Sequence, residues 1–217
     1  MNMLRLEYDI QHHLVLSKRN PVDHALIRMI VSTLSTPAEL CNLRKRDFKV
    51  VRGRDFEYYT VALSDGITRR ISPVDEKTYN LMLSLPATPF KLGMEEMDAV
   101  VSKYSPPDRS YNCEKLRKAV ETFLKDAAFS IEIGSIKSLE ERYAYMLDFN
   151  PLYSGLWDLE EYEDVEDFIL NYSEVSGVKD PNIIAAELGV EEDVVRKVLG
   201  SGKRSILFYN KSFTVRK

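Results

Sequence analysis

Apolar residues recur at helical spacing in several parts of the chain, which predicts a mainly helical fold. The first such stretch runs from about 22 to 34, with apolar side chains at Ala25, Leu26, Met29, Ile30 and Leu34. A second stretch covers 113–129, and a third covers 181–199, where Gly189 falls at the turn between two short helices. The prolines at 86, 89, 106 and 107 indicate a loop between the first and second stretches.

The pattern is different between the first helix and the prolines, where β-branched and aromatic residues dominate. The β-rich runs are 50–51, 56–61 and 67–71, and the turns fall at Gly53 and Asp65-Gly66. Because Asp-Gly favours a tight hairpin, we expect a three-stranded antiparallel unit. The residues 72–75 then start another helix, which stops before Pro86. The predicted fold class is α+β, mainly α, with a small three-stranded antiparallel sheet.

The short sequence "STPAEL" predicts a helix start with a capping box. Thr36 is the expected N-cap, Pro37 occupies the first helical position and Glu39 the third. In this motif the Thr and Glu side chains each accept a hydrogen bond from the other residue's backbone N–H group. The helix is expected to end at about Arg44.

The length of 217 residues suits a single domain, 1–217, but charge is distributed unevenly along it. Residues 127–180 hold 3 basic and 13 acidic side chains, whereas 1–126 and 181–217 each have a net charge of +3. We therefore expect an acidic helical insertion at about 130–180. It is either a solvated helical hairpin or a site for a protein partner, and the overall charge of −4 does not exclude DNA as a partner of the basic parts.

The composition bears on whether the protein enters a membrane, is secreted, or holds a disulfide or a metal. No apolar run reaches the roughly 18 residues that a membrane span needs, and the N-terminus has no signal-peptide pattern. Cys41 and Cys113 lie far apart without CxxC spacing, so we expect no disulfide, no metal and no cofactor. A cytoplasmic protein that does not enter a membrane is the simplest interpretation.

The helical pair at 181–199 fits a helix-turn-helix unit, which is one interpretation of the function. Val190, Val194 and Leu199 would pack the second helix on the first, and Arg196 and Lys197 would lie near phosphates. Three acidic residues in a row, 191–193, would start the recognition helix and repel DNA.

A second interpretation uses the order of all the elements. The stretches "LSTPAELCNLRKRDF", "ALSDGITRRISPVDEKTYNLM", "EKLRKAVETFLKDAAF" and "VEEDVVRKVLGSGKRSILFYN" follow one another along the chain. Together they resemble four motifs of the catalytic domain of tyrosine recombinases, the phage-integrase family, and archaeal integrases most of all. The resemblance covers about 22–129 and 182–213 and leaves the acidic block as an insertion.

The resemblance implies an enzyme that cleaves a DNA strand by attack of a tyrosine on a phosphodiester. Two arginines of the family hold the phosphate, and a lysine and two histidines manage protons. In this sequence the first arginine position is Thr36, the lysine position is near Asp65, and the histidine positions are Glu114 and Ser201. At the positions of the second arginine and of the nucleophilic tyrosine, the sequence keeps the residue types of the family, as Arg117 and Tyr209.

The replacement of these catalytic residues determines whether we expect strand cleavage. Removing one oxyanion-stabilising donor typically costs about 3–4 kcal/mol of transition-state stabilisation, and several are replaced here. We therefore expect a DNA-binding protein without strand cleavage, with Tyr209 and Arg117 as the remaining catalytic candidates. We expect weak DNA binding that rests mainly on contacts to the phosphates. The expected contacts come from one basic face, formed by Arg69, Arg70, Arg117, Lys203 and Arg204. The alternatives are an active recombinase that uses Tyr209 and a helix-turn-helix regulator.

Overall fold

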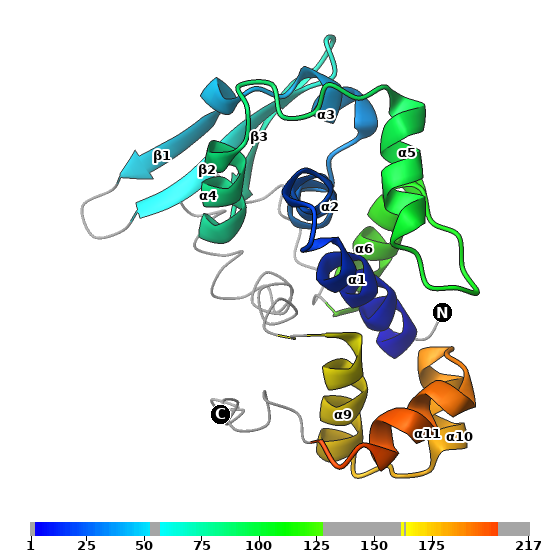
Figure 1. The fold of residues 1–217 in the computed structure, drawn as a ribbon. Coiled ribbons are helices and arrows are strands. Elements are labelled where there is room, and N and C mark those ends of the chain that lie inside the picture. Colours follow the sequence, from blue (N-terminus) through cyan, green and yellow to red (C-terminus); the bar gives the residue numbers. More distant parts are fainter. Residues whose placement is uncertain (1–2, 53–56, 128–161, 163, 204–217) are drawn as a thin grey trace.

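Helix α2 (Pro21–Thr33) is the centre of the fold in the computed structural model, which describes residues 3–52, 57–127, 162 and 164–203 (Figure 1). Asn20 caps its first turn, and residues 25–31 are buried on every side of the helix. Four other helices contact α2, together with strand β3. These helices are α1 (Met3–Ser17), α4 (Glu76–Ser84), α5 (Met94–Lys103) and α6 (Cys113–Ala127).

A three-stranded antiparallel sheet covers one side of this helical group. Its strands are β1 (Phe48–Arg52), β2 (Glu57–Ser64) and β3 (Arg69–Val74), in the order β1-β2-β3. Phe48 pairs with Val61, and both side chains are buried on the inner face of the sheet. Because side chains alternate along a strand, the residues next to Phe48 in β1 and next to Val61 in β2 point to the opposite face of the sheet. Mainly helical structure with a small antiparallel sheet confirms the predicted α+β class.

The predicted capping box is confirmed at the start of α3 (Pro37–Asn42). The Glu39 backbone N–H donates to Thr36 Oγ1 at 3.3 Å, and the Thr36 backbone N–H donates to Glu39 Oε2 at 2.9 Å. The helix is followed by a short 3-10 turn, η1 (Lys45–Asp47), which leads directly into β1.

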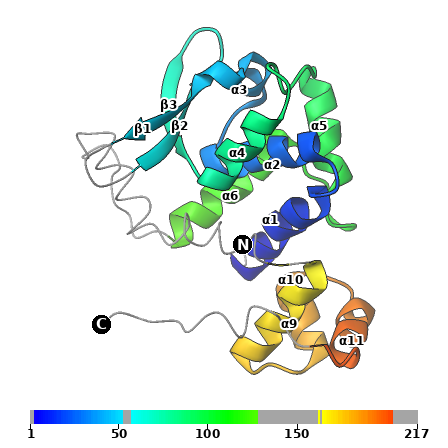
Figure 2. The ribbon, with the colours of Figure 1, turned by 60° about the vertical axis from the view of Figure 1, so that its left-hand side comes forward.

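The C-terminal helices form a second part of the molecule, below α1 and away from the sheet in Figures 1 and 2. They are α9 (Val165–Ser176), α10 (Pro181–Leu188) and α11 (Glu192–Gly200). The helical pair is therefore confirmed, and Gly189 between its helices adopts the left-handed conformation, with φ of 65°. The predicted packing is wrong for Val194, which is 43% exposed, because Val195 and Val198 face the core instead.

Helix α9 belongs to the core although it lies within the acidic block. Phe168, Ile169 and Leu170 are buried, and the ring of Phe168 packs against that of Tyr8 in α1 with centroids 5.8 Å apart. The end of the expected insertion is therefore part of the packed domain. Positions 130–161 and 163 of the expected insertion lie outside the described residues.

Arg109 connects the two parts of the molecule through a buried ion pair and a hydrogen bond. Arg109 Nη2 lies 2.6 Å from Asp9 Oδ1 in α1, and Arg109 Nη1 donates to the Gly189 carbonyl oxygen at 2.6 Å. The hydroxyl of Tyr111 donates to the other carboxylate oxygen of Asp9 at 2.6 Å. Gly189 has no side chain, and a Cβ atom there would lie 2.6 Å from Arg109 Nη1 and 2.7 Å from Arg5 Nε. The close approach of the C-terminal helices to α1 therefore depends on glycine at this turn.

The structure also contains elements that the sequence patterns did not predict. Helix α1 was not anticipated, and α5 lies where the prolines indicated only a loop. The residues 72–74 belong to β3, so that Asp75 alone caps α4, where it also pairs with the buried Arg28. None of the helices in the described part of the chain has the length and apolar character needed to cross a membrane.

Candidate functional site

Thr36, which the resemblance to tyrosine recombinases aligns with an arginine, lies beside an ion pair that links α3 to the sheet. Arg70, in β3, donates from Nε to Glu39 Oε1 at 2.7 Å and from Nη2 to Glu39 Oε2 at 3.0 Å. This two-pronged contact holds the same carboxylate that completes the capping box with Thr36. The Arg70 guanidinium is therefore already occupied by a carboxylate.

Glu39 is charged at neutral pH in this arrangement. Burial alone would raise the pKa of its carboxyl group, but the hydrogen bonds from Arg70 and Thr36 outweigh that effect and keep the pKa below its ordinary value. The charge of Glu39 also contributes to the raised pKa of Arg117 in α6, after the larger effect of Glu114. Glu39 is thus in contact with one predicted site arginine and within electrostatic range of the other.

Arg117 is held by carboxylates of its own helix. Its Nε and Nη2 atoms donate to Glu114 at 3.0 and 2.8 Å, and Nη1 lies 3.9 Å from Glu121. The latter is the i,i+4 pair expected from the sequence. Lys118 Nζ also lies 3.5 Å from Glu114, the residue that the resemblance aligns with a histidine. A phosphate that approached Arg117 would have to displace these carboxylate oxygens.

The predicted basic face is wrong as a single surface. Arg69 and Arg70 are neighbours in β3, so their side chains leave opposite faces of the sheet. Lys203 lies at a distant groove beside the C-terminal helices, where its Nζ is 3.3 Å from Glu166. Tyr209 and Arg204 lie outside the described residues, so their roles stay predictions.

A cleft on the outer side of the sheet collects arginines instead. It has a volume of about 220 Å³ and is lined by Arg44, Arg46 and Arg69, together with Asn42, Leu43, Asp47, Ala62 and Ser64. The three arginines are exposed, and within the described part of the chain none of them forms an ion pair. Asp47 is also present, where it accepts a hydrogen bond from the backbone N–H of Arg44 at 2.8 Å.

Two further cations extend the positive charge of this cleft along the chain. Lys45 belongs to η1 and Lys49 to β1, on the outer face where it pairs with Thr60 of β2. The sequence analysis missed this site, although the run "LRKRDFK" carries four of its five cations. The arrangement can neutralise phosphates without first breaking an ion pair.

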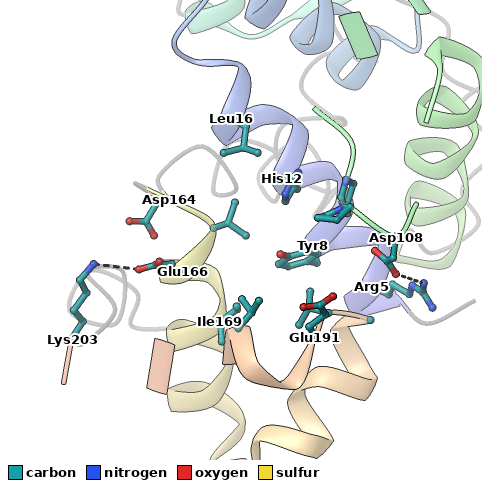
Figure 3. Close-up of a pocket in the computed structure, with 16 residues that line it drawn as sticks. Arg5, Tyr8, His12, Leu16, Asp108, Asp164, Glu166, Ile169, Glu191 and Lys203 are labelled. Atoms are coloured by element: carbon teal, nitrogen blue, oxygen red, sulfur yellow. Dashed lines mark hydrogen bonds and ion pairs between the residues drawn. The ribbon is translucent and has the colours of Figure 1, made fainter. Parts of the chain in front are cut away.

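A larger groove separates α1 from the C-terminal helices (Figure 3). It has a volume of about 1090 Å³, and apolar side chains such as Leu16 and Ile169 line it together with Tyr8 and His12. Burial raises the pKa of Tyr8 to about 12 and lowers that of His12, so that both side chains are neutral at pH 7.

The rim of the groove is acidic. Arg5 pairs with Asp108 at 3.5 Å and Lys203 with Glu166 at 3.3 Å, as the dashed lines in Figure 3 show. Asp164 and Glu191 add two further negative charges to the lining. This groove is therefore unsuited to DNA phosphates, and an apolar floor with an acidic rim favours a basic segment that carries apolar side chains.

Comparison with known proteins finds a relative in an archaeon. The chain is 56% identical over 214 residues to an uncharacterized protein of Archaeoglobus fulgidus, an alignment that covers 98% of this chain and 100% of the relative. It therefore belongs to the same protein family as that archaeal protein. No protein-family model and no solved structure matches the chain.

Proposed function

We propose that this protein binds DNA through phosphate contacts at the outer face of its sheet, in the cytoplasm, and that it is an integrase-like domain without strand cleavage. One observation carries the proposal. Arg44, Arg46 and Arg69 converge on one cleft without carboxylate partners among the described residues. Arg70 and Arg117, in contrast, are both paired with carboxylates.

The expected binding follows from the electrostatics of the cleft. Each phosphate that a basic side chain neutralises releases condensed counterions, so the logarithm of the affinity falls by about 0.9 per contact for each tenfold rise in salt. Contacts to phosphates position a protein on the duplex but carry no direct sequence information. We therefore expect weak binding that depends steeply on salt and little on sequence.

The proposed loss of cleavage rests on the surroundings of Arg117. Strand cleavage would need a second guanidinium where Thr36 lies, and Arg70 nearby is held by Glu39. Glu114 stands at a histidine position and carries negative charge, because its contact with Arg117 keeps its pKa below the ordinary value. A phosphate at this place would meet two carboxylates, which disfavours an active recombinase.

The helix-turn-helix alternative is less well supported. The first turn of α11 carries Glu192 and Asp193, and Glu192 forms an ion pair with Arg196 on the same helix. A helix that entered the major groove would therefore bring carboxylates towards the phosphates, and one of its basic residues is already paired.

A charge-matched pair of variants tests the DNA proposal. The triple variant Arg44→Gln, Arg46→Gln, Arg69→Gln is expected to weaken binding and to reduce the salt slope by roughly 3 units. The control replaces Lys77, Lys91 and Lys197, exposed cations outside the cleft, with Gln and thus has the same net charge. Fluorescence anisotropy with a short duplex at several salt concentrations measures both. Equal losses in the two variants, or no binding by the wild type at low salt, would contradict the proposal.

A protein partner is a second candidate, favoured by the acidic rim of the groove at α9. We propose that a basic segment with apolar side chains binds there. A synthetic peptide of alternating Lys and Leu is a suitable probe, and the variant Glu166→Gln, Glu191→Gln is expected to bind it several-fold more weakly. Equal affinity of the wild type and the variant in anisotropy titrations would remove this candidate.

A further inference from the structure

The turn between β2 and β3 presents an isoleucine to solvent. Ile67 is 95% exposed, whereas Ile71, on the outer face of β3, is 56% exposed. The turn projects beyond the rest of the fold at the top of both Figure 1 and Figure 2. Turn positions usually hold Gly, Asn, Asp, Ser or Pro, so a β-branched apolar residue at this tip is not explained by turn formation.

Hydrogen bonds within the turn fix the backbone that carries Ile67. Asp65 Oδ1 accepts from the backbone N–H groups of Ile67 and Thr68 at 2.8 and 2.6 Å, and Asp65 Oδ2 accepts from the Thr68 hydroxyl at 3.0 Å. Ser64 Oγ donates to the Thr68 carbonyl oxygen at 2.9 Å. Gly66 takes a φ of 95°, which suits glycine. The tip is thus rigid, and Ile67 is held outward.

The position of the tip relates it to the basic cleft. Arg69, two residues after Ile67, lines that cleft and has no ion-pair partner among the described residues. A duplex whose phosphates bind Arg69 would therefore have its bases close to the tip of the hairpin. The carboxylate of Asp65 is engaged within the turn by three hydrogen bonds, so it is not directed at a ligand.

We propose that Ile67 is an apolar wedge, which enters the stack of bases of a DNA duplex held by the basic cleft. This inference rests on the proposed DNA binding and adds a distortion of the DNA to it. Proteins that place an apolar side chain between base pairs unstack one step and kink the duplex, and neighbouring cations hold the backbone in place. Flexible pyrimidine–purine steps are the expected sites, because they unstack most easily.

Two measurements on intact protein test the wedge. The first is the fluorescence of duplexes with 2-aminopurine at successive positions, which rises when the base loses its stacking. The second is ring closure of a duplex of about 150 base pairs, close to the persistence length, which is accelerated by kinks. The wild type is expected to raise both signals. Ile67→Ser is expected to abolish both and to lower DNA affinity about five- to tenfold while the salt slope stays unchanged.

Ile71→Ser is the matched control, because it removes another exposed isoleucine, which lies on the outer face of β3 rather than at the tip of the turn, and should keep both signals. Wild-type protein that binds DNA in a salt-dependent manner without either signal would overturn the wedge and leave the DNA proposal intact. The same holds if Ile67→Ser behaves like the wild type. Absence of salt-dependent binding by the wild type would overturn both.

Discussion

Arg70 and Glu39 form a two-pronged ion pair that connects β3 to the first turn of α3, with N–O distances of 2.7 and 3.0 Å. The pair lies next to Thr36, where the resembling family has an arginine. The carboxylate of Glu39 thus contacts both Thr36 and the Arg70 guanidinium, and a phosphate would compete with it for Arg70. This relationship makes Glu39 the residue that limits anion binding at the inner edge of the sheet.

We expect Glu39→Gln to strengthen DNA binding. The substitution releases Arg70 for one more phosphate at the inner edge of the sheet, outside the basic cleft, which should raise affinity at low salt about three- to tenfold and increase the salt slope by roughly 1 unit. Gln at the third helical position still completes a capping box, so the start of α3 should persist. Anisotropy titrations at several salt concentrations measure the effect.

The control for that variant is Glu57→Gln, which removes the same charge from the exposed Arg52–Glu57 pair at the other end of β2. It should change the affinity only slightly, because exposed ion pairs contribute little. An equal gain in both variants would attribute the effect to net charge, and no gain in Glu39→Gln would contradict a role for Arg70.

No covalent adduct is expected between this protein and DNA. A nicked suicide substrate would trap a phosphotyrosyl link, but under the proposed integrase-like assignment the cations and proton donors needed to form it are replaced at Thr36, Glu114 and Ser201. Gel electrophoresis under denaturing conditions detects such an adduct. An adduct that disappeared in Tyr209→Phe would show that cleavage is retained and that other cations support it.

Gly189→Ala should destabilise the fold strongly. The φ of 65° strains any side chain, and a Cβ atom would press on Arg109 and Arg5, so we expect a loss of roughly 3 kcal/mol in the free energy of unfolding. At Gly177 the φ is 73° but no atom lies within 4 Å of a Cβ. Gly177→Ala should therefore cost only about 1 kcal/mol. Urea denaturation compares the two, and equal losses would argue against a tight contact at Gly189.

Acid should destabilise the protein through His13. Burial lowers the pKa of this side chain to about 4, from an ordinary value of 6.5. Between these values the unfolded chain binds a proton that the folded protein refuses, so stability falls as the pH drops from 6.5 towards 4. In His13→Gln the decrease between pH 7 and 4.5 should be smaller by about 2–3 kcal/mol. An unchanged decrease in chemical denaturation would assign the effect to other groups.

Local sequence signals predicted several elements of the fold well. The capping residues Thr36 and Glu39 fix the start of α3 by contacts within four positions, so the sequence alone shows them. The turns at Asp65-Gly66 and Gly189 are likewise local. Helix α1 was missed because its polar residues are buried: Asp9, His12 and His13 find partners elsewhere in the fold, and the pattern of an amphipathic helix is lost.

The site was predicted less well because it depends on long-range placement. The sequence shows Arg70, Arg117 and Glu39, but it does not show that the fold brings the Glu39 carboxylate into contact with Arg70 and within electrostatic range of Arg117. Arg69 reaches Arg44 and Arg46 only because the sheet places Arg69 opposite Ser64 at the end of β2. The basic run from 44 to 49 was the available signal, and an interpretation based on family motifs passed over it.

The contact of Arg109 with Asp9 and Gly189 also has a consequence for synthesis of the chain. Asp9 and Arg109 can pair once residue 109 has been synthesised, but the hydrogen bond from Arg109 to Gly189 forms only after nearly the whole domain has left the ribosome. Until then Tyr8, and the side of α1 that faces α9 and α10, has no covering helix. A nascent chain that stops before 165 therefore exposes an apolar helix face, and α9, α10 and α11 complete the domain by shielding it.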